Sequence, residues 1–383
     1  MQDLEKYFQY ISTKRIREPM YKIELLHKED DSVIGEITHA IEDGSGSISI
    51  SNQDGSRRSA SFTLNNYHNQ WDKYFKYLSI GQRFKVSLGY KIDGEPIWFP
   101  QGVFVYNDPS LQSQLSNITI NISGNDKWSL LDGTAGGILD ATFQVPAGTS
   151  MGKFVNDTLK LDIVKDYVLP NIDSSVFNQT TTYDIIHSAG ETVASVILEV
   201  AANLSCYAYY DENGVFTMRP FDYDETLSSV YDYTYKDINY LGATKVLPIS
   251  KIYNSVLVVS DNMQNSYSPI VSMLDNNDVT DINSVINGAT RKVYNVTDNI
   301  AGIYTQKQAD ERARYELKKV ACMQSTISLT SLPLYHLREN EVVTITDPYL
   351  GCDKERFLIS GINFSIGTDG SSTLDLVKTT RYL

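Results

Sequence analysis

Hydrophobic and polar residues alternate through the first third of the chain. Four runs repeat with a period of two: Ser47–Ile50, Ala60–Leu64, Phe84–Leu88 and Ile118–Ile122. Such alternation is typical of antiparallel strands that bury one face and leave the other polar. Turn sequences such as Asp93-Gly94 separate the runs. The spacing therefore predicts one β-barrel or β-sandwich that ends near residue 130.

The middle of the chain changes to a helical period. Within residues 190–204, apolar side chains fall at Val193, Val196, Ile197 and Val200, which would form one stripe along a helix. Asn213-Gly214 then marks the turn of a hairpin, because both residues tolerate a positive φ. A shorter helix is predicted over residues 149–161. These signals indicate a mixed α+β segment.

Strand patterns return from about residue 245. The candidates are Lys251–Ser260, Pro269–Met273, Arg291–Val296, Ser325–Leu329, Glu341–Ile345, Glu355–Phe364 and Ser372–Lys378. One Ala-, Arg- and Glu-rich helix is predicted over Gln306–Val320. We expect Val256 and Val258, from the first of these strands, to point into the core of this unit. Val343 and Ile345, from a later strand, are expected to share that core.

The predicted fold class is mainly β with an α+β insert. A first β-barrel domain is expected over residues 1–135, and an α+β central region with a helix and a hairpin over residues 136–244. A second β-barrel domain with one packed helix is expected over residues 245–383. Two β units around a mixed centre also indicate an internal duplication, although no repeat is visible by sequence identity.

Composition and charge narrow the function. Of the 383 residues, 42% are hydrophobic and 21% charged, which is typical of a globular protein. The net charge of −14 disfavours a protein that reads DNA sequence, because such proteins usually present a basic face. Residues 206–287 carry eleven acidic and four basic side chains, and eight tyrosines lie between Tyr207 and Tyr240. This segment is either a solvated acidic face or a surface that meets a partner or repels a polyanion.

Three features of the sequence concern the compartment. The longest apolar run, Val193–Leu204, has twelve residues and includes Glu199, so no bilayer-spanning helix and no membrane anchor are expected. The chain begins Met-Gln-Asp-Leu-Glu, which does not match a secretory signal. Its three cysteines are far apart, which fits a reducing compartment rather than a disulfide framework: Cys206, Cys322 and Cys352.

Candidate chemistry is sparse. None of the five histidines lies within His-x-x-x-His spacing of another or close to a cysteine, so no zinc site is predicted. His187 precedes Ser188, but a Gly-x-Ser-x-Gly elbow is missing, which favours a capping or surface role for His187. The acidic run at residues 275–281 lacks the central glycine and closing glutamate of a calcium loop, so a solvated loop is expected.

Paired carboxylates could be proposed for glycoside cleavage. Glu191 with Glu199 is one such pair, and the cluster Asp222, Asp224 and Glu225 is another. The reaction requires a defined separation between the two carboxyl groups, which sequence does not give. We therefore predict no enzyme, no catalytic residue, no cofactor-binding residue and no metal ligand.

Three ordered patterns carry a family resemblance. The first runs from Gly55-Ser56-Arg57-Arg58 to Asp126-Lys127-Trp128, the second is the helix and hairpin over 191–220, and the third runs from Ala309 to Thr380. In this order they resemble the baseplate-hub and tail-tip proteins of tailed bacteriophages. That group includes late-control protein D and the N-terminal structural part of tail-associated lysins.

The resemblance implies a structural role in the virion tail tip after synthesis in the host cytoplasm. It implies a homotrimer in which each subunit contributes two tail-tube-like β-barrel domains, giving six around the axis. Such a ring would join a sixfold distal tail protein or tail tube ring to threefold tip components. The tape measure protein and tail fibre or receptor-binding components would be further partners. DNA would only pass through, and an acidic lumen would repel its phosphates.

Two alternatives remain open from the sequence. One is a tail-associated cell-wall hydrolase, which is disfavoured because such lysins continue into a cleaving domain whereas this sequence ends at Leu383. The other is a carbohydrate- or receptor-binding module, whose aromatic residues would be expected on loops. Trp71, Trp98 and Trp128 instead lie in or beside strand patterns.

Overall fold

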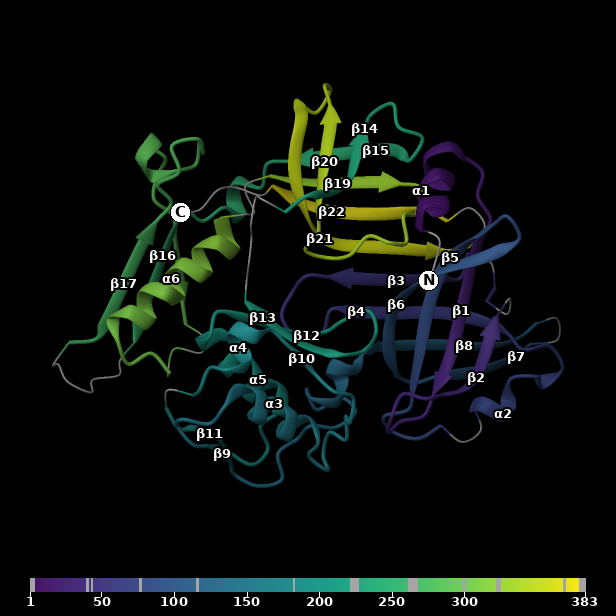
Figure 1. The fold of residues 1–383 in the computed structure, drawn as a ribbon, viewed down its shortest axis with the longest axis horizontal. Coiled ribbons are helices and arrows are strands. Elements are labelled where there is room, and N and C mark those ends of the chain that lie inside the picture. Colours follow the sequence, from purple (N-terminus) through teal and green to yellow (C-terminus); the bar gives the residue numbers. More distant parts are fainter. Residues whose placement is uncertain are drawn as a thin grey trace.

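The computed structural model describes most of the chain. The described residues are 4–38, 41–42, 44–75, 78–114, 117–181, 183–220, 227–260, 268–297, 300, 302–321, 325–367 and 370–378. Strands dominate, and fourteen of them join one large sheet (Figure 1). The prediction of a mainly β protein is confirmed.

The first β unit covers one end of this sheet. Its elements are α1 (Leu4–Thr13), β1 (Pro19–Leu26), β2 (Val33–Thr38), β3 (Gly46–Ser51), β4 (Arg58–Asn65), α2 (Asp72–Phe75), β5 (Arg83–Ile92), β6 (Glu95–Tyr106), β7 (Ser110–Gln114) and β8 (Asn117–Asp126). The strands pair antiparallel in the order β3-β4-β8-β6-β5-β1-β2, and β7 also pairs with β8. Along β4 every second residue is buried, as the alternation predicts.

The central region packs around its own core. Its elements are β9 (Phe143–Val145), α3 (Met151–Leu159), β10 (Asn171–Ile172), α4 (Ser174–Phe177), β11 (Ile185–His187), α5 (Val193–Asn203), β12 (Cys206–Tyr210) and β13 (Phe216–Pro220). The side chain of Thr192 caps α5 by accepting a hydrogen bond from the Ser195 amide at 3.1 Å. The predicted stripe, including Val196 and Ile197, is buried, and the predicted hairpin is β12–β13.

The second β unit continues the large sheet. It consists of β14 (Ser229–Thr234), β15 (Tyr240–Val246), β19 (Thr326–Ser331), β20 (Val342–Asp347), β21 (Cys352–Ile366) and β22 (Ser372–Lys378). Their order is β15-β19-β22-β21-β20-β14. The boundary drawn from the sequence between residues 244 and 245 falls within β15.

The two β units repeat one topology. In the first, the sheet order is β3-β4-β8-β6-β5, and in the second it is β15-β19-β22-β21-β20. Each set also has the same order along the chain, and all the pairings are antiparallel. This match is what an internal duplication would produce. We refer to β15 as the counterpart of β3, β22 as that of β8, β21 as that of β6 and β20 as that of β5.

A separate α/β unit is inserted between β15 and β19. It contains β16 (Ser255–Ser260), β17 (Ile270–Asp275), β18 (Val293–Val296) and α6 (Gln306–Ala321), with the sheet order β17-β16-β18. Val256 and Val258 pack there with α6, whereas Val343 and Ile345 lie in the core of the large sheet. The prediction of one shared core is wrong, because a period of two identifies the buried face of a strand but not its sheet.

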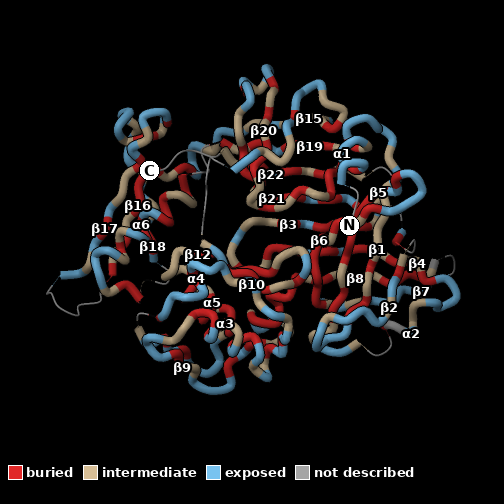
Figure 2. Tube along the Cα trace, in the orientation of Figure 1, coloured by how far each residue is buried: buried red, intermediate tan, exposed pale blue. Residues whose placement is uncertain are grey.

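Burial follows these units (Figure 2). One continuous core underlies both β units, and distinct cores fill the central region and the inserted unit. Across the described ranges, no helix combines the length and the apolar character needed to cross a membrane.

Candidate assembly surfaces

The junction between the two β units is a strand pairing. β3 pairs antiparallel with β21, so that Ile48 faces Phe364 and Ile50 faces Ile362. All four side chains are at most 2% exposed. The backbone hydrogen bonds and the shared apolar core make the two units one continuous structure rather than two linked bodies.

Buried charges reinforce this junction. The guanidinium of Arg58, on β4, donates to both carboxylate oxygens of Glu339 at 2.6 and 2.7 Å. It also donates to the carbonyl of Gln101 at 3.0 Å. Arg57 lies over the ring of Tyr209, with 3.5 Å between Cζ and the ring centroid. These contacts join both β units to the β12–β13 hairpin.

Asp126 holds the chain beside this ion pair. Its carboxylate accepts the backbone amides of Arg57 at 2.6 Å, Arg58 at 3.0 Å and Trp128 at 3.2 Å. Burial raises the pKa of Asp126 to about 6, although these hydrogen bonds act to lower it. The group therefore orders the start of β4 and the end of β8 at once.

A second charged cluster attaches the central region. The Lys127 ammonium lies 2.7 Å from a carboxylate oxygen of Asp166 and 2.9 Å from one of Asp31. Arg83 pairs with the same Asp31 at 2.6 Å, and the hydroxyl of Tyr210 donates to Asp166 at 2.9 Å. Two cations and two carboxylates thus compensate one another in a mostly buried site.

A histidine side chain lies between Glu191 and Glu199, the two carboxylates considered for glycoside cleavage. His187 contacts Glu191 through Nδ1 and Glu199 through Nε2, the latter at 2.9 Å. The side chain of Ser195 donates to the carbonyl of Thr192 at 2.7 Å and lies 3.5 Å from Nδ1. His187 is 8% exposed, so the expected surface role is wrong. The imidazole links β11 to α5 and fills the space between the two carboxylates.

The predicted solvated loop is also partly buried. Asn276 and Asp281 are 1% and 5% exposed, and the amide of Asn276 donates to Asp281 at 2.6 Å. The other oxygen of Asp281 accepts the amide of Asn283 at 2.9 Å. These side chains stabilise the fold of the loop through hydrogen bonds to other groups of the same loop. In the part of the chain that the structure describes, no cluster of three His, Cys, Asp or Glu side chains could hold a metal.

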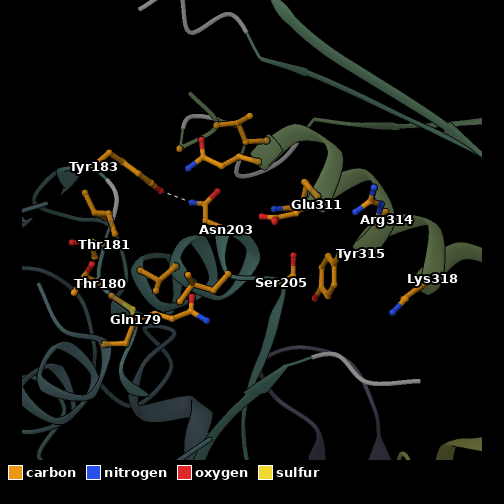
Figure 3. Close-up of a pocket in the computed structure, with 18 residues that line it drawn as sticks. Gln179, Thr180, Thr181, Tyr183, Asn203, Ser205, Glu311, Arg314, Tyr315 and Lys318 are labelled. Carbon is orange, nitrogen blue, oxygen red and sulfur yellow. Dashed lines mark hydrogen bonds between the residues drawn. The ribbon is translucent and has the colours of Figure 1, made fainter. Parts of the chain in front are cut away.

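A cavity of about 490 Å³ separates α5 from α6 (Figure 3). Tyr183 lies on its wall, where its hydroxyl donates to Glu199 at 2.7 Å and accepts from Asn203. A Cβ at Gly302 would lie 2.3 Å from Cζ and from the hydroxyl oxygen of Tyr183, so a larger residue there would require the Tyr183 ring to move. The cavity is polar on the α6 side, where Glu311 and the basic residues Arg314 and Lys318 line it. Sequence reasoning missed this site, because its lining is dispersed over residues 151–318.

The acidic, tyrosine-rich segment divides into two parts. Tyr207, Tyr209, Tyr210 and Tyr233 are core residues, each at most 6% exposed. Asp222, Asp224 and Glu225 lie outside the described residues. These four tyrosines are therefore packed strand residues and do not contribute to an exposed acidic face.

Several strand edges are open among the described residues. β15 pairs only with β19, and β7 only with β8. Leu241 and Val246 of β15 are 47% and 49% exposed, and Leu111 of β7 is 58% exposed. At the far end of the sheet, Val33 on β2 is 56% exposed. Open edges with apolar side chains are suited to pairing with another chain.

Comparisons with known proteins bear on the fold. No family model matches the sequence, and no curated protein matches it. A tail protein from Neisseria meningitidis MC58 has a similar structure, with a TM-score of 0.61, 13% identity and coverage of 94% of this chain and 96% of that one. The 43 kDa tail protein of prophage MuSo2 from Shewanella oneidensis has a TM-score of 0.61 at 14% identity, with coverage of 94% of this chain and 99% of that one.

Prophage tail protein gp18 from Listeria monocytogenes EGD-e gives a TM-score of 0.55 at 12% identity, with coverage of 94% and 95%. At sequence identities of 12–14%, the similarity is one of fold. It extends over nearly the whole length of each chain. The resemblance to phage tail proteins is therefore confirmed at the level of the fold.

Proposed function

We propose that this chain is a structural baseplate-hub or tail-tip protein of a tailed phage. The observation that carries the proposal is the repeated five-strand unit, which occurs twice in a chain that has the fold of phage tail proteins. Three copies would supply six such units, the number needed to meet a sixfold ring while keeping threefold symmetry for the tip.

The proposed homotrimer surrounds the DNA exit channel at the tail tip. Its sixfold side contacts the distal tail protein or tail tube ring, and its threefold side contacts tip components. The tape measure protein and fibre or receptor-binding components are further proposed partners. The buried charge clusters support a mechanical role, because they hold the β units and the central region in one fixed arrangement.

The proposed role is non-enzymatic. His187 occupies the space between Glu191 and Glu199, and hydrogen bonds within the chain satisfy these side chains. A peptidoglycan zymogram of the purified protein tests the enzyme alternative, and clearing of the gel would contradict a purely structural role.

Counting the copies in isolated tail tips tests the trimer. Native mass spectrometry should give three copies per tip, and cryo-electron microscopy should place six related β units around the axis. Six copies, or a location away from the tip, would overturn the proposal. A monomer in dilute solution would not, since assembly can depend on the neighbouring ring.

A further inference from the structure

The β3–β21 junction shows how one repeat unit binds the next. Residues 361–364 of β21 pair with β22 on one side and with β3 on the other. Before that point, residues 352–358 pair with β20. β21 is therefore longer than its own unit requires, and its second half receives the edge strand of the first unit.

The first unit has an equivalent acceptor edge. There, β6 and β7 together take the place of β21, because both pair antiparallel with β8, the counterpart of β22. β6 also pairs with β5, the counterpart of β20. The outer edge of β7 consequently corresponds to the edge of β21 that binds β3.

The second unit has an equivalent donor strand. β15 corresponds to β3, and among the described strands its outer edge has no partner. The core-facing side chains differ in burial: Ile48 and Ile50 of β3 are 0% and 2% exposed, whereas Tyr240 and Ala243, which face the same core from β15, are only partly buried. Residues 110–113 of β7 are all exposed. β7 and β15 lie far apart within one chain (Figure 1), so they cannot satisfy each other.

The one lysine of β15 does not oppose pairing. A lysine on an edge strand commonly blocks the addition of another strand. Here the Lys245 ammonium donates to the carbonyl of Leu350 at 3.2 Å and lies 3.5 Å from the carboxylate of Glu355. Its charge is directed into its own unit and away from the open edge.

We propose that β15 of one copy pairs antiparallel with β7 of a second copy of this chain. The contact between chains then repeats the β3–β21 contact within each chain. Two different strands meet, so the interface is heterologous, and alternating the two junctions closes a ring of six units from three copies. This inference rests on the proposed trimer and identifies the surfaces that form it.

Two equally exposed residues give a matched test. Leu111 on β7 is 58% exposed and Val33 on β2 is 56% exposed, and both lie on edge strands of the same sheet. Leu111→Lys should leave the circular dichroism and melting temperature of the monomer unchanged but reduce the trimer fraction in assembled tips at least tenfold. Val33→Lys should leave the trimer intact, because β2 has no counterpart in the repeated five strands.

A photo-crosslinking residue at position 111 identifies the partner strand. In assembled tips, mass spectrometry should find links from position 111 to residues 240–246 of another copy. Trimers with links only to other segments, or trimers unaffected by Leu111→Lys, would overturn the inference while leaving the trimer standing. Wild-type tips without three copies would overturn the proposed function itself, and with it this inference.

Discussion

Arg58 and Glu339 are 281 positions apart in sequence and form an ion pair in which one guanidinium nitrogen contacts both carboxylate oxygens. Their side chains are only 1% and 4% exposed. Arg58 begins a strand of the first β unit, and Glu339 precedes β20 of the second. The pair is therefore a sensitive reporter of the junction between the units.

Breaking this pair should destabilise the whole sheet. Glu339→Gln leaves the Arg58 cation buried without a counter-charge, and the loss of a buried partner costs about 3–5 kcal/mol. The free energy of unfolding, measured with urea, should fall by that amount. Glu18→Gln is the control, because Glu18 pairs with Lys91 at 3.4 Å on the surface, where the loss should be below about 1 kcal/mol. Equal effects of the two variants would refute the junction role.

The two separate cores can be tested with two matched variants. Val258→Asp buries a charge in the inserted unit, and Val343→Asp buries one under the large sheet, each at a cost of several kcal/mol. In native-state hydrogen exchange, Val258→Asp should deprotect β16, β18 and α6 while β20 and β21 stay protected. Val271→Asp, at a site that is 45% exposed, should change little. Deprotection of β20 by Val258→Asp would mean that the cores are coupled.

Asp126 should make stability fall with rising pH. Its folded pKa of about 6 lies above its ordinary value, so its contribution is present below that ordinary value and is lost as the pH rises through 6. Relative to Asp126→Asn, the wild-type free energy of unfolding should drop by roughly 2 kcal/mol between pH 4 and pH 7. Parallel pH profiles for the two proteins would show that the folded carboxyl has an ordinary pKa.

His336 should act in the opposite direction over much of the same range. Burial, and secondarily the charge of Arg338, lowers the pKa of His336 to about 4. The unfolded chain then binds the proton first, so this contribution is complete above pH 6.5 and is lost as the pH falls towards 4. Tyr7 of α1 contacts Nδ1 at 3.0 Å, so exchange of α1 amides should accelerate on acidification. His336→Asn, which keeps an acceptor, should remove that pH dependence, and an unchanged profile would refute it.

The acidic segment gives a prediction about genome passage. If Asp222, Asp224 and Glu225 face the channel, replacing all three with lysine should leave tail assembly intact and slow DNA ejection, because the lysines attract phosphates. The defect should ease as salt rises, since charges more than about 8 Å apart are largely screened at physiological ionic strength. Normal ejection at low salt would identify the segment as a solvated face, and failed assembly at any salt would identify it as an interface.

Local pattern predicted the elements better than their partners. Alternation identified β4, β5 and β8, and the stripe through Val196 and Ile197 identified α5, because both follow from one buried face. The destination of β16 could not be predicted, since a strand with that pattern fits any sheet with one covered face. The pairing of Arg58 with Glu339 could not be predicted either, because the two residues are 281 positions apart and no local pattern connects them.

The candidate surfaces were hidden for a related reason. A strand edge is open when no other strand pairs with it, so the sequence of β7 or β15 alone does not reveal an open edge. His187 was assigned to a capping or surface role because the sequence around it lacks a Gly-x-Ser-x-Gly elbow. Its burial depends on Glu199, which lies twelve positions further along, in the second turn of α5.

The β3–β21 pairing also has a kinetic consequence. On the ribosome, β3 is complete after 51 residues, whereas its partner strand ends at residue 366. The edge of the first unit is therefore uncovered while most of the protein is still being synthesised, and closing it requires a contact of very long sequence separation. During that interval β21 of a neighbouring chain offers the same hydrogen bonds and the same apolar face. Domain-swapped dimers are thus the characteristic misfolded product expected of this fold at high expression.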